Sequence, residues 1–358
     1  HPTDVNDRMK FNNHEKIERN INQTDRLYRN NGNNTFEDIT AEAGINNHGY
    51  GLSVQVFDYN EDGWPDLYIS NDFAMYNYVY VNNQDGTFSE KGKEIFSKNC
   101  LFSMGTEISD FNNDGLLDII SVDMEALDNF FFKAYFPDVR VTQYRTMNHS
   151  GYHYQYPRNA LYLNNGGGSY SEIARVTGIS TTEWSWGPLF VDFDNNGLKD
   201  LFIANGYFHH LKMDRWPHKK KMADATRRGD ADTFDSLCVG FEDDYYKAVN
   251  RFYLNEGGLN FTEKSTEWGV DYGTMSNGTA CGDLDLDGDI DLVVNNFNET
   301  PIIYKNNSER LGNSYLQVKL AGPPGNSTGI NSTVKVKTGE LEQVQMLHAT
   351  RSFLSSSP

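Results

Sequence analysis

Short runs of apolar and aromatic residues, separated by segments rich in Asp, Asn and Gly, recur along this 358-residue chain. One polar segment lies between Val54–Phe57 and Leu67–Ile69, and another lies between Leu189–Val191 and Leu201–Ile203. Short runs that are rich in β-branched and aromatic side chains are typical of strands. The pattern therefore predicts an all-β protein built from many short strands.

A second element follows each of these strand pairs, and one copy precedes the first pair. We interpret it as a strand, an Asn/Gly turn and another strand. Together with the preceding pair it makes a four-stranded antiparallel unit, and such units at regular spacing predict the blades of a β-propeller. The copies lie at Leu27–Phe36, Val79–Phe88, Leu161–Tyr170, Phe252–Phe261 and Ile303–Asn307.

The polar segments share one nine-residue pattern, Asp-x-Asp/Asn-x-Asp/Asn-Gly-x-x-Asp, in four copies. Side-chain oxygens at positions one, three, five and nine, with a backbone carbonyl at position seven, suit the oxygen shell of calcium, and the Gly permits the sharp bend. The predicted ligands are Asp58, Asn60, Asp62, Trp64, Asp66, Asp110, Asn112, Asp114, Leu116, Asp118, Asp192, Asp194, Asn196, Leu198, Asp200, Asp283, Asp285, Asp287, Asp289 and Asp291.

An alternative interpretation is that Asp, Asn and Gly simply form turns between strands. Four copies that keep oxygen ligands at the same four positions favour calcium, although one copy can still be metal-free. The flanking strands and the absence of a Glu at position twelve distinguish the pattern from an EF-hand. We therefore expect up to four calcium ions with a structural role.

Two long insertions interrupt the repeat, at about residues 123–158 and 207–250. Both occupy the connection after the second strand of a unit, so we expect them on the face opposite the calcium turns. The first is rich in aromatic residues and the second is largely helical in pattern. Aromatic side chains with scattered polar groups suit recognition of a sugar or peptide, but they also suit packing of the inserts onto the propeller. The candidate ligand-binding residues are Tyr135, Tyr144, Tyr152, His153, Tyr154, Tyr156 and Trp216.

Composition narrows the partners and the compartment. The formal net charge of −19 argues against nucleic acid and anionic membrane surfaces, and four calcium ions would reduce it to −11. Weak calcium sites fit an extracellular location. The three cysteines lack zinc-like spacing. The sequence contains no run of about 18 apolar residues, so it predicts no membrane-spanning helix. The chain begins at His1 rather than Met, so we expect a processed product or a fragment.

Several stretches of the sequence resemble a known family of repeats. Leu27–Gly44, Gly187–Tyr207 and Ser276–Asn307 resemble the FG-GAP/VCBS repeats of integrin-α-like calcium propellers, especially those of large bacterial surface proteins. Residues 313–358 resemble the start of an ASPIC/UnbV module. The resemblance implies a propeller over 1–310, a partial small β domain over 311–358, and a ring of seven blades. Four loops fall short of seven blades, so either further blades lie outside this sequence or a partner chain completes the ring.

The leading functional hypothesis is a non-enzymatic, extracellular calcium-binding module for adhesion or recognition of polysaccharide or protein. The alternative is a structural subunit of a cell-surface assembly or filament, with open β edges as contacts. Asn-x-Ser/Thr sequons would allow glycosylation. An enzyme using His153 is a third possibility, but no nucleophile elbow, zinc motif or phosphate loop is found.

Overall fold

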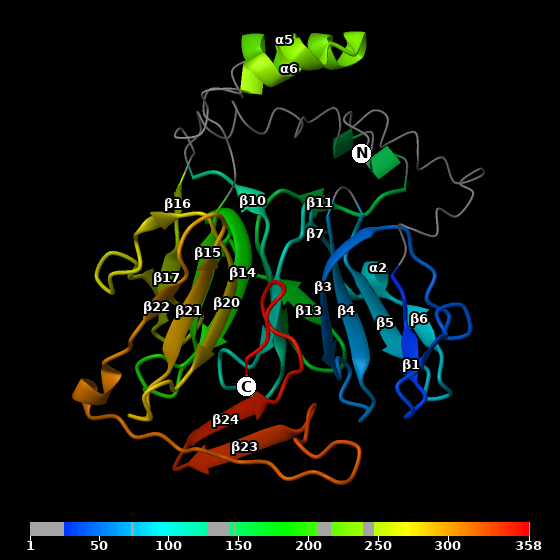
Figure 1. Cartoon of the computed structure of the whole chain (residues 1–358). Coiled ribbons are helices and arrows are strands. Elements are labelled where there is room, and N and C mark those ends of the chain that lie inside the picture. Colours follow the sequence, from blue (N-terminus) through cyan, green and yellow to red (C-terminus); the bar gives the residue numbers. More distant parts are fainter. Residues whose placement is uncertain are drawn as a thin grey trace.

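A computed structural model describes residues 25–72, 75–127, 144–145, 148–149, 151–206, 216–238 and 247–357, without the side chains of 216–219, 234–235 and 238. β-Strands are the main secondary structure of the described chain, and their small antiparallel sheets are arranged around a common centre in a propeller-like ring (Figure 1). This arrangement confirms the predicted all-β propeller-type fold.

Four of the sheets form the body of the molecule, and we number them blades 1 to 4 in chain order. Blade 1 contains β3 (Tyr50–Phe57), β4 (Asp66–Asp72), β5 (Tyr78–Asn82) and β6 (Phe88–Glu90). Blade 2 contains β8 (Thr106–Ser109), β9 (Asp118–Ser121), β12 (Ala160–Asn164) and β13 (Tyr170–Glu172). Blade 3 contains β14 (Glu183–Val191), β15 (Asp200–Asn205), β17 (Arg251–Asn255) and β18 (Phe261–Glu263). Blade 4 contains β20 (Ser276–Gly282), β21 (Asp291–Asn296) and β22 (Ile302–Tyr304).

The fourth strand predicted for the last unit is wrong. After β22 the chain forms a 3₁₀ helix, η2 (Ser308–Leu311), instead of a turn and a strand. The other copies place a Gly with positive φ in this turn, whereas Asn307 is followed by Ser308. Ser adopts the left-handed region less readily than Gly, which makes the tight hairpin less favourable here. At the other end, β1 (Tyr28–Asn30) and β2 (Phe36–Asp38) form a separate hairpin before blade 1, as the first copy of the element predicts.

The hydrophobic core lies between neighbouring blades. Side chains alternate along a strand, so Ile119 packs toward blade 1 while Ile120 packs toward blade 3. Each fully buried side chain of this size stabilises the fold by roughly 1.5–3 kcal/mol. The buried residues between blades 1 and 2 include Phe57, Tyr68, Phe96, Ile108, Ile119 and Tyr162. Those between blades 2 and 3 include Phe111, Ile120, Leu161, Phe190, Leu201 and Ile203, and those between blades 3 and 4 include Leu189, Phe202, Phe252, Leu292 and Val294.

A buried Asn fixes the start of the third strand in blades 1, 2 and 3. Asn77 Oδ1 accepts a hydrogen bond from Asn71 N (3.0 Å), and Asn250 Oδ1 accepts one from Asn205 N (2.8 Å). Asn159 accepts from Asp123 N (2.8 Å) in the same way. These bonds satisfy a backbone donor where the ladder ends, and they keep the strand register at the points where the two inserts leave and return.

Both inserts leave the blades at the end opposite the nine-residue loops. The second contains α5 (Trp216–Arg228) and α6 (Ala231–Cys238), which contact each other, as its helical pattern predicts (Figure 1). The ends of the first insert form β10 (Met124–Glu125), which pairs with β14, and β11 (Gln155–Tyr156). β11 lies parallel to β7 (Asn99–Cys100), which follows α2 (Gly92–Ile95). β16 (Ala248–Val249) ends the second insert and pairs with β19 (Gly273–Thr274). We call this the insert face and the opposite one the loop face.

The C-terminal part of the chain returns across the loop face. β23 (Thr333–Thr338) and β24 (Leu341–Met346) form a hairpin below the blades, and residues 347–357, which we call the tail, then run up between them (Figure 1). The tail bonds to the first strand of every blade. These hydrogen bonds are Thr350 Oγ1 to Val54 O (2.8 Å), Thr106 N to Ser352 O (3.3 Å), Arg351 Nη2 to Phe190 O (3.0 Å) and Thr279 N to Ser355 Oγ (3.1 Å).

Candidate functional site

The four nine-residue segments are the turns between the first two strands of each blade, and we number them loops 1 to 4. In every loop the first Asp accepts hydrogen bonds from the backbone N–H groups of positions five and six. In loop 1, Asp58 Oδ1 accepts from Asp62 N (3.1 Å) and Oδ2 accepts from Gly63 N (2.7 Å). Asp110, Asp192 and Asp283 repeat this pair of bonds. The first Asp therefore shapes the turn as well as offering oxygens to a cation.

The Asp at position nine is buried in every loop. Its Oδ1 accepts from the N–H of an Asn at the end of the third strand, or just after it in blade 4, and its Oδ2 accepts from the N–H of position two. The pairs formed by Oδ1 are Asp66 with Asn82 (2.7 Å), Asp118 with Asn164 (2.8 Å), Asp200 with Asn255 (2.9 Å) and Asp291 with Asn306 (2.8 Å). These side chains are almost completely buried.

Burial has an electrostatic consequence for these carboxylates. It raises the pKa of Asp118 and Asp200 to about 8 and that of Asp66 to about 6. It also raises the pKa of Asp192, at position one of loop 3, to about 6. A nearby cation favours the charged form and opposes this shift. The loops therefore hold carboxylates that ionise most favourably with a cation beside them.

Two loops bring three carboxylates together. One oxygen from each of Asp192, Asp194 and Asp200 lies within 4.8 Å of the others, and the same holds for Asp283, Asp285 and Asp287. Ligands of one calcium ion, at 2.3–2.6 Å from it, lie at most about 5 Å apart. The spacing and the all-oxygen donor set fit calcium. The ion would neutralise the clustered carboxylates and hold the hairpin closed.

Loops 1 and 2 have an amide at position three. Asn60 Nδ2 donates to Asp62 Oδ2 (3.1 Å), and Asn112 Nδ2 donates to Asp114 Oδ2 (2.9 Å). Asn60 Oδ1 accepts from Asp62 N (3.1 Å), as Asn112 Oδ1 does from Asp114 N (3.3 Å). Each of these two loops thus has one fewer carboxylate than loop 4 at the four side-chain positions.

Positions four and seven complete the turn. Position four has positive φ in all four loops, a feature that the sequence pattern left unassigned although Asn113 and Asn195 favour that conformation. At position seven, where a backbone carbonyl ligand was predicted, the N–H groups of Trp64, Leu116 and Leu198 donate to the side-chain oxygen of position five (2.9, 2.9 and 2.7 Å). Asp289 N does so at 3.4 Å.

The loop face is covered in part by the C-terminal segment, which sequence patterns did not indicate. Gln343 Nε2 of β24 donates to Gly197 O of loop 3 (3.0 Å). The buried ammonium of Lys199 donates to Asp110 O of loop 2 (2.7 Å) and to Val344 O of β24 (2.8 Å). The hairpin therefore ties loops 2 and 3 together.

The described candidates on the insert face include a pair of tyrosines, Tyr144 and Tyr156, and two consecutive residues, His153 and Tyr154. Tyr144 and Tyr156 form a hydrogen-bonded pair (2.9 Å between hydroxyl oxygens), and the Arg158 guanidinium lies over the Tyr156 ring at 4.6 Å. Tyr154 is 54% exposed, and His153 Nε2 contacts Phe96 O at 2.6 Å. His153 is partly buried, this burial lowers its pKa, and the Nε2 contact holds one edge of its ring against the fold.

The remaining candidates have limited structural support. Tyr152 is partly buried, and burial raises its pKa to about 12. Tyr135 lies outside the described residues, and Trp216 begins α5 with its side chain outside them. The structure therefore brings Tyr144, Tyr154, Tyr156 and His153 to one region, and Tyr152 directly precedes His153 in the chain.

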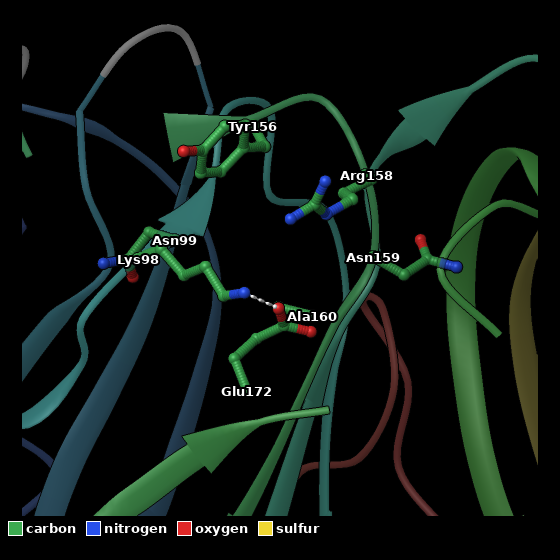
Figure 2. Close-up of a pocket in the computed structure, with 7 residues that line it drawn as sticks. All are labelled: Lys98, Asn99, Tyr156, Arg158, Asn159, Ala160 and Glu172. Carbon is green, nitrogen blue, oxygen red and sulfur yellow. Dashed lines mark ion pairs between the residues drawn. The ribbon is translucent and has the colours of Figure 1, made fainter. Parts of the chain in front are cut away.

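A small recess opens beside Tyr156. Its volume of about 10 Å3 accommodates little more than one water molecule, far less than a small-molecule pocket offers. Figure 2 shows the Lys98 ammonium paired with the Glu172 carboxylate (2.7 Å) below Tyr156 and Arg158. Its lining residues are Lys98, Asn99, Tyr156, Arg158, Asn159, Ala160 and Glu172. The recess suits part of a larger ligand better than a whole small molecule.

Comparison with known proteins supports the repeat. Three stretches match the model of the FG-GAP-like repeat, at residues 17–69, 58–121 and 138–203, and together they include loops 1 to 3. The chain thus has a propeller-like fold, and three stretches of it are similar to the FG-GAP-like repeat. No curated protein sequence matches it. Among the described residues, no helix has the length and apolar character to cross a membrane.

Two solved structures resemble the fold weakly. They are rhamnogalacturonan lyase YesW (13% identity, TM-score 0.32) and the exotype rhamnogalacturonan lyase YesX (12% identity, TM-score 0.32). The alignments cover 70% and 68% of this chain but 41% and 38% of the lyase chains. The chain thus spans about two fifths of their length, and no activity is carried over from them. The ASPIC/UnbV assignment stays a prediction.

Proposed function

We propose that this protein is a non-enzymatic, secreted calcium-binding recognition or adhesion module that binds polysaccharide or protein through its insert face. The observation that carries the proposal is that the acidic loops and the aromatic and cationic side chains lie on opposite faces of the blades. The four loops, with their buried carboxylates, lie on one face and are tied into the fold. The aromatic and cationic side chains around Tyr156 gather on the other.

Calcium has a structural role in this proposal. Asp66, Asp118 and Asp200 each bond to the third strand of their own blade. An ion bound to such a residue therefore braces three strands at one point. The ligand surface on the insert face then depends on calcium through the rigidity of the blades rather than through direct coordination of the ligand.

The exposed ring of Tyr154 allows a direct test. We expect an array of glycans and extracellular proteins, probed with calcium-loaded protein, to identify a ligand whose binding falls at least tenfold in Tyr154→Ala. Tyr28→Ala is the matched control, because Tyr28 is equally exposed (55%) but lies on β1. Equal loss in both variants, or binding that Tyr154→Ala leaves intact, would argue against the insert face as the ligand surface.

A structural subunit of a surface assembly is the second candidate. Blade 4 ends in β22, which pairs only with β21 in the described chain, and Ile303 on it is 65% exposed. An open edge with an exposed apolar residue favours pairing with another chain. Light scattering separates the candidates: concentration-dependent growth that Ile303→Lys abolishes would favour assembly, and a stable monomer would exclude it.

The absence of catalysis is also part of the proposal. His153 is the residue that an enzyme hypothesis would use, but its Nε2 contacts a backbone carbonyl. We therefore expect no cleavage of polysaccharides by the calcium-loaded protein. Cleavage that is lost in His153→Ala, with folding retained, would overturn this part of the proposal.

A further inference from the structure

Loop 4 differs from the other loops at position seven. Trp64, Leu116 and Leu198 occupy this position elsewhere, whereas loop 4 has Asp289, which is 0% exposed. Asp289 Oδ2 accepts hydrogen bonds from Ser308 Oγ (3.3 Å) and from the N–H of Glu309 (3.2 Å). Asp289 Oδ1 is buried without any hydrogen-bond partner. A buried carboxylate oxygen in this state is unfavourable unless a cation or a proton satisfies it.

Asp287 and Glu309 complete a group around this carboxylate. One oxygen from each of Asp287, Asp289 and Glu309 lies within 4.8 Å of the other two. Among the described residues, no cationic side chain pairs with Asp289; Lys305 pairs with Asp285 and Asp287 instead. Asp287 also belongs to the group formed with Asp283 and Asp285. It therefore stands between two adjacent sets of carboxylates.

The missing fourth strand of blade 4 brings Glu309 to this place. Because η2 replaces a hairpin after β22, the chain folds back onto loop 4, where Ser308 and Glu309 contact Asp289. Gly312 closes the 3₁₀ helix with φ 77°, and the Tyr315 ring packs against Gly288. In blades 1 to 3 a fourth strand follows instead, so no other loop acquires an equivalent carboxylate from this connection.

The charge of the region exceeds what one ion balances. Asp283, Asp285, Asp287, Asp289, Asp291 and Glu309 carry six negative charges, and Lys305 supplies one positive charge. The resulting net charge of −5 falls to −3 with one divalent ion and to −1 with two. Like charges within contact distance repel strongly when they are shielded from water.

We propose that Asp287, Asp289 and Glu309 form a second divalent-cation site in blade 4, with the Asp287 carboxylate shared between this ion and the ion of loop 4. The site takes a hard, oxygen-preferring cation, and calcium is the expected one because carboxylates are the ligands and the geometry is irregular. The inference rests on calcium binding by loop 4. It adds a fifth ion to the four that the repeat predicts.

Calcium stoichiometry of the full chain, measured by equilibrium dialysis and titration calorimetry, tests the proposal. We expect Glu309→Gln to bind one ion fewer than the unaltered protein, or to bind it at least tenfold more weakly. Asp283→Asn should lose only the loop 4 ion, and the double variant should lose two. Glu340→Gln is the control, because this exposed glutamate lies in the β23–β24 turn. Circular dichroism checks that each variant is folded.

The outcomes separate this inference from the proposed function. If Glu309→Gln binds as many ions as the unaltered protein while Asp283→Asn loses one, a shared proton balances the cluster and the second site is refuted, but calcium binding by the loops stands. If the unaltered protein binds no calcium, both proposals fail. Asp289→Asn supplies a second check, since it replaces the buried carboxylate with an amide of equal size and should also lose the extra ion.

Discussion

Single buried polar residues act in this protein as clamps on the backbone. Asp123 Oδ2 accepts from Leu101 N (2.7 Å) and Phe102 N (2.9 Å), and burial raises the pKa of Asp123 to about 8. Lys199 binds two carbonyl oxygens, and burial lowers its pKa to about 8. Perturbed pKa values often mark catalytic groups. Here both side chains are buried because they form hydrogen bonds to the backbone. At this scale the ionisable groups serve the architecture.

His348 provides a pH-dependence prediction at the residue scale. Burial lowers the pKa of His348 from 6.5 to about 4, so the folded protein keeps it neutral while the unfolded chain protonates it. Between pH 6.5 and 4 the unfolded state binds more protons, and stability falls as the pH falls. The difference between these two pKa values corresponds to about 3 kcal/mol of unfolding free energy. Chemical denaturation in saturating calcium should show this loss, and His348→Gln should remove it.

The comparison between the two proteins isolates His348 from the carboxylates that titrate in the same range. The expected readout is a difference in unfolding free energy between His348→Gln and the unaltered protein that changes by about 3 kcal/mol from pH 7 to pH 4. A difference that stays constant with pH would show that His348 titrates alike in both states.

Loops 2 to 4 form a connected series at the element scale. Asn113 Nδ2 in loop 2 donates to Gly197 O in loop 3 (2.7 Å), and Asn195 Nδ2 in loop 3 donates to Gly288 O in loop 4 (3.2 Å). Both Asn residues occupy position four, where φ is positive. The same residue thus accepts a left-handed backbone and links its loop to the next. Loop 4 has Leu286 at this position, and the described chain offers no further loop for it to reach.

Leu286→Asn should therefore stabilise the protein. Leu286 has φ 64° and is 80% exposed, so the substitution relieves backbone strain and loses little burial. A left-handed conformation costs most L-residues about 1–2 kcal/mol, and Asn tolerates it better. We expect a gain of about 1 kcal/mol in unfolding free energy. Leu284→Asn, at an exposed neighbour without positive φ, is the control and should give no gain.

Features formed by residues close together in the sequence could be predicted, whereas contacts between distant residues could not. Strands and loops repeat within tens of residues, so Asp58–Asp66 and its three counterparts predicted the blade pattern, which the structure confirms. The role of their side chains as calcium ligands stays a prediction. The 3₁₀ helix after β22 was missed although Ser308 replaces the usual Gly. The role of the Asp289 side chain depends on Glu309, which comes from another element, and no spacing rule connects them. The contacts of Gln343 and Arg351 join residues more than 140 positions apart.

At the scale of the whole molecule, calcium should set the thermal stability. Each site that is saturated at 100 times its Kd adds about 2.7 kcal/mol to the folded state. Excess EDTA should therefore lower Tm by roughly 10 °C or more, with recovery on addition of calcium but not of equimolar sodium. Differential scanning fluorimetry measures the shift. An unchanged Tm would mean that the loops are turns stabilised by their hydrogen bonds alone.

The tail, residues 347–357, joins the blades through a buried ion pair. Arg351 and Glu107 form a buried ion pair in which Glu107 Oε1 accepts from Arg351 Nε (2.7 Å), and Glu107 Oε2 accepts from Ser352 N (3.2 Å). Removing one partner of such a pair leaves the other charge buried and costs about 3–5 kcal/mol, whereas apolar replacement of both is often far less damaging. The pair therefore ties the tail to β8 at the centre of the blades.

A double-mutant cycle tests this link. Arg351→Met should lower the unfolding free energy by about 3–5 kcal/mol and expose residues 347–357 to limited proteolysis, since Glu107 would remain without its cation. Adding Glu107→Leu to that variant should recover part of the loss, because no charge is then left buried. Urea denaturation measures all four proteins. Simple additivity of the two single changes in unfolding free energy would show that the two ions do not interact. A tail that stays protease-resistant in Arg351→Met would show that its other contacts, such as Thr279 N to Ser355 Oγ, suffice to hold it between the blades.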